Sequence, residues 1–213
     1  WPGLEATLHL EAERVAAERE DALKHERDLF ALPEAERTQA VHREPRFRTL
    51  ALGLALLEHS PSPAIGERIE RACLAIAIAD LLVERQGSHA TRAALRSAAG
   101  LALAEALREQ GNLVQAEIEL KAVATCLEAS GDALDRARYA RALGLLRRDQ
   151  QSPEEAFALL DRAAMLFGEI GETRRQVGTL LALGELHLDL ADSRAAFAAF
   201  DAALAVLERD EEG

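Results

Sequence analysis

The hydrophobic positions of this chain follow a helical spacing, and the spacing returns further along the sequence. Apolar residues recur three and four positions apart, as in residues 153–170, PEEAFALLDRAAMLFGEI. Residues with this spacing share one face of an α-helix, so each such segment predicts a helix with one buried stripe. A similar string, SRAAFAAFDAALAVLE, occupies residues 193–208. The pattern therefore predicts a repeated helical unit.

Matching positions recur every 40 residues without an insertion. The four matching sets are Ala104, Gly144 and Gly184; Ala116, Ala156 and Ala196; Leu120, Leu160 and Phe200; and Val123, Ala163 and Ala203. A fixed period of this size indicates a solenoid, in which each repeat packs mainly on its neighbours. Breakers divide each copy into two helices. In the second copy Ser152 is placed to cap a helix that starts at Pro153.

This arrangement resembles the tetratricopeptide repeat family. The resemblance rests on the small residue where paired helices cross, the alanine early in the second helix, the large apolar residue four positions later and the smaller one three after that. The 40-residue period is similar to the longer-helix variety found in bacterial regulators and signalling scaffolds. The resemblance implies an all-α, right-handed solenoid of helical hairpins whose first helices line a concave groove.

We expect three regions along the chain. Residues 89–213 form three repeats, at about 93–132, 133–172 and 173–211. Residues 45–88 form a degenerate repeat, with Leu52-Gly53 in its first helix and with Ala72, Ile76 and Ala79 in its second. Residues 1–44 form an N-terminal cap and linker.

The N-terminal segment carries a narrow apolar stripe at seven-residue spacing. The stripe consists of Leu8, Val15, Ala22 and Leu29. We expect a capping helix that lays Leu8, Val15 and Leu29 on the first repeat. The alternative is a helix that binds a partner or a second copy of the chain. The chain is accordingly expected to be a monomer, or a weak homodimer through this helix.

Composition narrows the classes of partner. The chain has six Phe, one Tyr and one Trp among 213 residues, so its core must be built mainly from Ala and Leu. Its formal net charge of −12 argues against a nucleic-acid surface, because phosphate binding needs a basic face. No apolar run approaches the ~20 residues that cross a bilayer, so we expect no membrane partner and a cytoplasmic location. Cys73 and Cys126 lie in apolar helical patterns and are expected to be buried free thiols.

The sequence carries no motif for catalysis. Gly-rich phosphate loops, nucleophile elbows, HExxH and paired-cysteine motifs are all missing. The six histidines are scattered and lack a second ligand at helical spacing. We therefore expect no enzymatic activity, no cofactor and no metal.

One charge pattern points to a binding surface. Arg138, Arg141, Leu145 and Arg148 stand three, four and three apart, which places them on one face of the first helix of a repeat. The resemblance implies that this helix lines the groove. The positions one period away are Ala98, Leu101, Glu105 and Arg108 on one side, and Gly178, Leu181, Glu185 and Leu188 on the other. The alternative is that Asp135, Asp149 or the acids at 154 and 155 neutralise these arginines in ordinary surface pairs.

The expected groove has a basic centre, apolar steps and two acidic markers. Its residues are Arg138, Arg141, Leu145, Arg148, Leu101, Glu105, Arg108, Leu181 and Glu185. Because the guanidinium fork matches a carboxylate, an acidic or carboxylate-terminated peptide or protein is the expected partner. The first functional hypothesis is a non-enzymatic scaffold or adaptor that holds such a segment. The second is a regulatory sensor module of a larger bacterial signalling or transcription-control protein.

Overall fold

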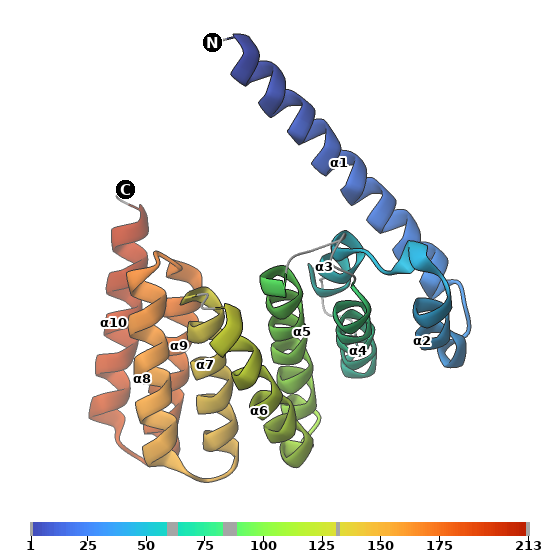
Figure 1. The fold of residues 1–213 in the computed structure, drawn as a ribbon. Helices are drawn as coiled ribbons and strands as arrows, with labels where there is room; N and C mark the ends of the chain where they lie inside the picture. Colours follow the sequence, from blue (N-terminus) through green and yellow to red (C-terminus); the bar gives the residue numbers. More distant parts are fainter. Residues whose placement is uncertain (1, 59–63, 83–88, 131–132, 212–213) are drawn as a thin grey trace. The chain divides into compact units, whose positions relative to one another are not determined.

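The computed structural model describes residues 2–58, 64–82, 89–130 and 133–211 (Figure 1). Across these ranges the chain forms ten α-helices and one short 3-10 helix, with no strand. The predicted all-α class is confirmed. The chain divides into two compact units, Trp1–Ala102 and Leu103–Gly213, and the boundary falls within one helix, α5 (His89–Glu109).

The first unit holds the N-terminal helices. They are α1 (Pro2–Phe30), α2 (Glu34–Arg43), η1 (Pro45–Phe47), α3 (Leu50–Glu58), α4 (Ile65–Leu81) and the start of α5. Its core consists of large side chains at most 2% exposed, which are Leu29, Val41, Phe47, Leu52, Leu56, Leu74, Ile78, Leu82 and Leu95. Burial of these apolar groups is the main force that holds the short helices together.

A cluster of charged side chains fastens α1, α2 and α4 around one ring. The guanidinium carbons of Arg37 and Arg71 lie 4.6 and 4.5 Å from the centre of the Phe30 ring. Arg71 of α4 pairs with Glu26 of α1 at 2.5 Å, and Arg37 of α2 donates to both carboxylate oxygens of Glu70 at 2.8 Å. These contacts combine cation–π attraction with charge-assisted hydrogen bonds.

The N-terminal stripe is only partly buried. Ala22 and Leu29 are 2% and 0% exposed, and α1 packs on α3. Val15 is 57% exposed, so the prediction that it is covered by the first repeat is wrong. The side chain of Leu8 lies outside the described residues. Val15 is exposed because it borders an open pocket of about 520 Å³ between α1 and α3, which is also lined by Leu23, Leu50 and Leu54; α1 then continues past this region (Figure 1).

The degenerate repeat has a close crossing at Gly53. A Cβ atom at Gly53 would lie 2.6 Å from Leu95 Cδ2 and 3.5 Å from Ile78 Cγ2. Ala72 is buried as expected, whereas Ile76 is only half-buried. The large side chains beside the glycine are therefore Leu95 and Ile78 rather than Ile76.

The second unit stacks helical hairpins in chain order. Besides the end of α5 it holds α6 (Leu113–Ser130), α7 (Ala133–Asp149), α8 (Pro153–Glu169), α9 (Thr173–Asp189) and α10 (Ser193–Glu211). Within this unit α6 packs on α7, α7 on α8, α8 on α9 and α9 on α10. The alanines at 116, 156 and 196 are all 0% exposed, so this repeated set marks the packing seam.

Glycine permits close approach within the α7–α8 and α9–α10 hairpins. A Cβ atom at Gly144 would meet Leu160 Cγ at 2.9 Å and Leu159 Cβ at 3.2 Å. One period later, a Cβ atom at Gly184 would meet the Phe200 ring at 2.2 Å. The prediction of close crossings at both glycines is confirmed.

The turns within these hairpins share one backbone conformation at the same interval. Gly111, Gln151 and Ala191 have φ values of 86°, 61° and 60°. In each turn the next residue donates its N–H to a carbonyl five residues back, at 2.9 Å. These are the bonds and the left-handed residue of a helix C-terminal Schellman-type turn. The 40-residue period thus extends to the main chain, even where glycine is replaced.

The caps that follow these turns differ among repeats. Side-chain oxygens of Asn112 and Asp192 accept backbone N–H bonds from Gln115 and Ala195, at 3.3 and 3.0 Å. The corresponding Ser152 makes no side-chain cap bond, so the prediction of a serine cap at the start of α8 is wrong. Pro153 and the acidic first turn still favour a helix start there.

The remaining sequence expectations concern thiols and the membrane. Both cysteines are free, but Cys73 is exposed and Cys126 half-buried, so the prediction of two buried thiols is wrong. Cys73 lies on the solvent side of α4. Among the described residues, no helix has the length and apolar character needed to cross a bilayer.

Polar contacts join α6 to the end of α7. Glu117 accepts a hydrogen bond from Gln150 Nε2 at 3.0 Å and pairs with Lys121 Nζ at 3.2 Å and Arg147 Nη2 at 3.4 Å. These three donors, Gln150 foremost, lower the pKa of the Glu117 carboxyl from its ordinary 4.5 to about 2.

The two glycines of α9 provide a matched test of close packing. Gly184→Ala should lower the free energy of unfolding relative to Gly178→Ala by about 1–3 kcal/mol, because only the first substitution clashes with a ring. Nothing lies within 4 Å of a Cβ at Gly178, and alanine there should stabilise the helix by up to about 1 kcal/mol. Urea unfolding of both variants measures the difference. Equal stability would contradict the close crossing.

The lowered pKa of Glu117 predicts a specific acid sensitivity. A depressed folded-state pKa contributes stability that is complete above pH 4.5 and is lost as the pH falls toward about 2. Glu117→Gln should therefore flatten the decline in unfolding free energy across that window. The control is Glu128→Gln on the same helix, since Glu128 makes no ion pair with the described residues. If the two variants give the same pH profile, the contacts of Glu117 do not matter to folding.

Candidate binding site: an arginine pocket

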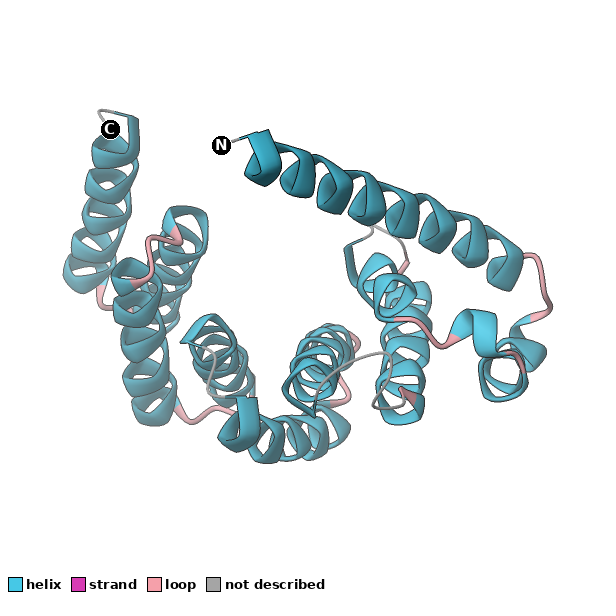
Figure 2. Ribbon diagram, turned by 45° about the horizontal axis from the view of Figure 1, so that its top comes forward, coloured by secondary structure: helices cyan, strands magenta, loops and turns pink. Residues whose placement is uncertain are grey.

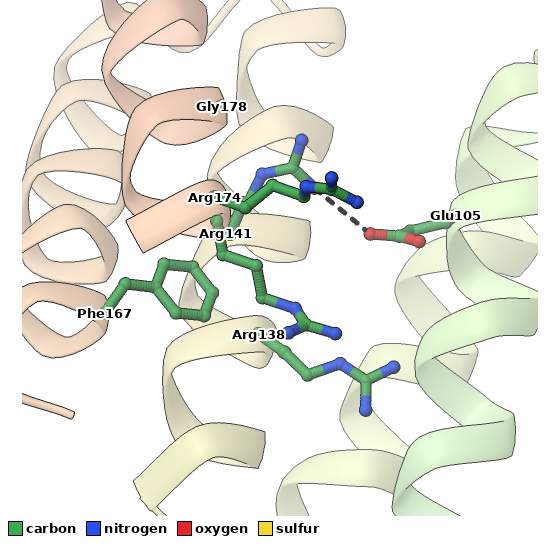
Figure 3. A pocket seen from close by; sticks show the side chains of 7 residues that line it. Glu105, Arg138, Arg141, Phe167, Arg174 and Gly178 are labelled. Carbon is green, nitrogen blue, oxygen red and sulfur yellow. Dashed lines mark hydrogen bonds and ion pairs between the residues drawn. The ribbon is translucent and has the colours of Figure 1, made fainter. Parts of the chain in front are cut away.

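A pocket of about 260 Å³ opens within the second unit (Figure 3). Its lining residues come from four helices and are Glu105, Arg138, Arg141, Phe167, Arg174, Arg175 and Gly178. Four arginines thus face one glutamate. The pocket is strongly basic in a chain of net charge −12.

Two neighbouring repeats supply the arginines. Arg138 and Arg141 lie three apart on α7 and so share a face, and Arg174 and Arg175 lie in the first turn of α9. Gly178 stands one turn further along α9, one period after Arg138. Because nothing lies within 4 Å of a Cβ there, the missing side chain leaves open space beside the arginines.

The arginines differ in their internal partners. Arg138 pairs with Asp135 at 3.4 Å, Arg141 with Glu105 at 3.4 Å, and Arg175 with Glu172 at 2.5 Å. Figure 3 shows Arg141 reaching across to Glu105.

Arg174 is exposed and makes no ion pair with the described residues of the chain. It is the cation most available to an incoming anion.

An aromatic ring lines the pocket below the charges. Phe167 is 0% exposed and packs in a cluster with Ala137, Ala140 and Ala163. Because the ring is fully covered by its neighbours, it supports the wall of the pocket and offers almost no apolar surface to a ligand.

The pocket contains only three of the nine predicted groove residues. Arg138, Arg141 and Glu105 come together as expected. Arg108 and Arg148 instead flank Asp149, at 2.7 and 3.6 Å, and Arg148 also pairs with Glu185 at 3.0 Å.

Arg108, Arg148 and Glu185 therefore form a separate chain of ion pairs outside the pocket lining. This matches the alternative in which internal acids neutralise the arginines.

The predicted apolar steps are mostly buried. Leu101 and Leu145 are 2% and 6% exposed, so the prediction that they offer surface to a ligand is wrong. Leu145 packs in the core with Leu160 and Ala156. Leu181 is 43% exposed but lies outside the pocket lining.

Sequence reasoning missed Phe167, Arg174 and Arg175, and used Gly178 only as a counterpart of Arg138. The one sequence signal for this side of the pocket is the pair of adjacent arginines, Arg174 and Arg175, at the start of α9. Two basic residues in the first turn interact unfavourably with the helix dipole, so their presence there suggests a role other than stabilising the helix.

No protein-family model, curated protein or solved structure matches this sequence. Within the described part of the chain, no group of three or more His, Cys, Asp or Glu side chains is arranged to hold a metal ion.

Proposed function

We propose that the second unit is a non-enzymatic binding module whose arginine pocket holds the acidic end of a protein or peptide segment. The observation that carries the proposal is the convergence of Arg138, Arg141, Arg174 and Arg175 beside an open glycine. Guanidinium groups recognise carboxylates through paired, charge-assisted hydrogen bonds. The 40-residue hairpin repeat and its resemblance to tetratricopeptide proteins support the same class.

The internal ion pairs favour a single carboxylate as the anchor. Three of the four arginines already face an acid, whereas Arg174 makes no ion pair with the described residues. A carboxylate placed at Arg174 would compete with Glu105 for Arg141, since that pair is long and partly exposed. Removing this competitor by Glu105→Gln should tighten binding.

The volume of the pocket sets the size of the anchor. About 260 Å³ holds one side chain or one terminal residue rather than an extended segment. The rest of a bound segment would therefore lie outside the pocket. The same volume also suits a small dicarboxylate, which favours the sensor as a second candidate function.

A set of synthetic peptides tests the proposal. Short peptides with Asp or Glu, or with a free C-terminal carboxylate, should bind the parent chain more tightly than their Asn, Gln or amidated counterparts. Arg141→Glu should weaken this binding at least about tenfold, because it replaces attraction by repulsion. Calorimetry with the peptides, and with succinate as the small dicarboxylate, measures both candidate ligands.

Matched variants separate the pocket from general charge effects. Gly178→Leu fills the open space without changing any charge and should abolish binding, whereas Gly178→Ala should retain it. Arg162→Glu makes the same charge change on the exposed surface of α8 and should bind like the parent. Succinate binding without peptide binding would favour the sensor. If Arg141→Glu and Gly178→Leu both bind peptide as the parent does, the pocket is not the site.

A further inference from the structure

The outer face of α10 is apolar and uncovered. Phe197, Leu204 and Leu207 are 67%, 55% and 42% exposed, although they lie on one helix at helical spacing. Figure 2 shows α10 at the edge of its unit, with no other helix of that unit beyond it. Three large apolar side chains on one helix face indicate an interaction surface.

The preceding repeat shows what this face is built to receive. One period earlier the same positions are Phe157, Ala164 and Phe167, of which the last two are 4% and 0% exposed. Phe167 packs on Ala137 and Ala140 of α7, and the helix that lies against Phe157 is α9. Its His187 ring lies 4.4 Å from the Phe157 ring.

The contact between α8 and α9 is also close at its other end. A Cβ atom at Gly168 of α8 would lie 2.7 Å from Gln176 Nε2 of α9. The start of α9 therefore faces the end of α8, and the two helices run antiparallel. An antiparallel helix with the same register is the geometry that the face of α10 fits.

The charges on α10 identify the partner. Arg194 stands near the start of the helix and Glu208 near its end, both are exposed, and neither makes an ion pair with the described residues. An antiparallel copy of α10 brings Arg194 of each chain to Glu208 of the other. A parallel copy would instead bring like charges together. We propose that this face joins two copies of the chain through an antiparallel pair of α10 helices.

The register taken from α8 and α9 supports self-pairing. In the α8–α9 pair, Gly168 lies opposite Gln176. If two copies of α10 pair in the same register, Glu208 takes the place of Gly168 and Arg194 of the second copy takes the place of Gln176. Phe197 then lies opposite Ala205 of the second copy, and Leu204 opposite Ala198. Large side chains thus meet small ones, as close helix packing requires.

Asp201 lies at the centre of the proposed helix pair. Its counterpart Asp161 stays exposed although α9 packs on α8, so Asp201 lies at the rim, as do Arg194 and Glu208, which stand seven residues to either side of it on the same stripe. Two Asp201 carboxylates can therefore remain in water.

Charge reversal with rescue tests the dimer. By light scattering and sedimentation the parent chain should have twice its monomer mass. Arg194→Glu and Glu208→Arg should each raise the dimer dissociation constant at least about tenfold, since each sets like charges face to face. Mixing the two variants should restore a dimer, because both like-charge contacts of each variant homodimer are then replaced by opposite-charge pairs. Circular dichroism should show all of them equally helical.

Two further variants locate the interface. Leu204→Glu places a charge in the apolar centre and should give a monomer, whereas Val15→Glu alters the exposed residue of α1 and should leave the dimer intact. The proposal is overturned if the parent is a monomer at all concentrations, or if Leu204→Glu remains a dimer. It is also overturned if the mixed charge variants fail to associate.

Discussion

The close approach of paired helices at a residue without a side chain governs the packing of the second unit. At Gly144 and Gly184 the facing residue occupies the space where a Cβ would lie. Because a Cβ at either glycine would clash with Leu160 or Phe200, these two hairpins hold their helices closer than a side chain there would allow, and the contact fixes their register. The buried alanines at 116, 156 and 196 keep the same seam narrow. The glycine at 53 places the same constraint on the first unit, against Leu95.

The features set by this seam could be predicted from the sequence. The 40-residue interval located the helices, the hairpin turns and the crossings because all three depend on local spacing and steric fit. The upstream repeat was located less well. Gly53 lies against Leu95 and Ile78 rather than Ile76, and the 40-residue interval does not extend to this repeat to fix its register.

The site was harder to predict because it is assembled between repeats. The helical spacing of residues on α7 predicted Arg138 and Arg141. Arg174 and Arg175 belong to α9, and they reach the pocket only because the two repeats pack side by side. The same stripe wrongly placed Leu145 on the surface.

Side-chain length explains the difference between the arginines and Leu145. Arg138 and Arg141 are about one-third exposed because a long stem carries the charged end out of a seam that covers a leucine. Position on a helix face alone does not distinguish these outcomes.

Arginine has two different roles in this acidic chain. Around Phe30 the guanidinium groups are largely buried and fully matched by carboxylates. Burial alone would lower the pKa of Arg71, but its bonds to Glu26 and Glu67 outweigh that effect and raise it. In the pocket the paired arginines are more exposed, two of the three pairs are longer at 3.4 Å, and Arg174 makes no ion pair with the described residues. The first arrangement fixes helices in place, and the second leaves charge available.

The turns at Gly111, Gln151 and Ala191 have a consequence for how such a chain can change in length. Their left-handed residues and main-chain bonds are the same whichever side chain is present. The backbone of the turn is thus common to the three hairpins, whereas the side-chain caps that follow it differ: Asn112 and Asp192 accept backbone N–H bonds and Ser152 does not. Forty residues could be excised or duplicated between two such turns with the junction unaltered. Because the turns share one backbone conformation, the array could differ in length by whole hairpins while the contacts between neighbouring helices keep their register.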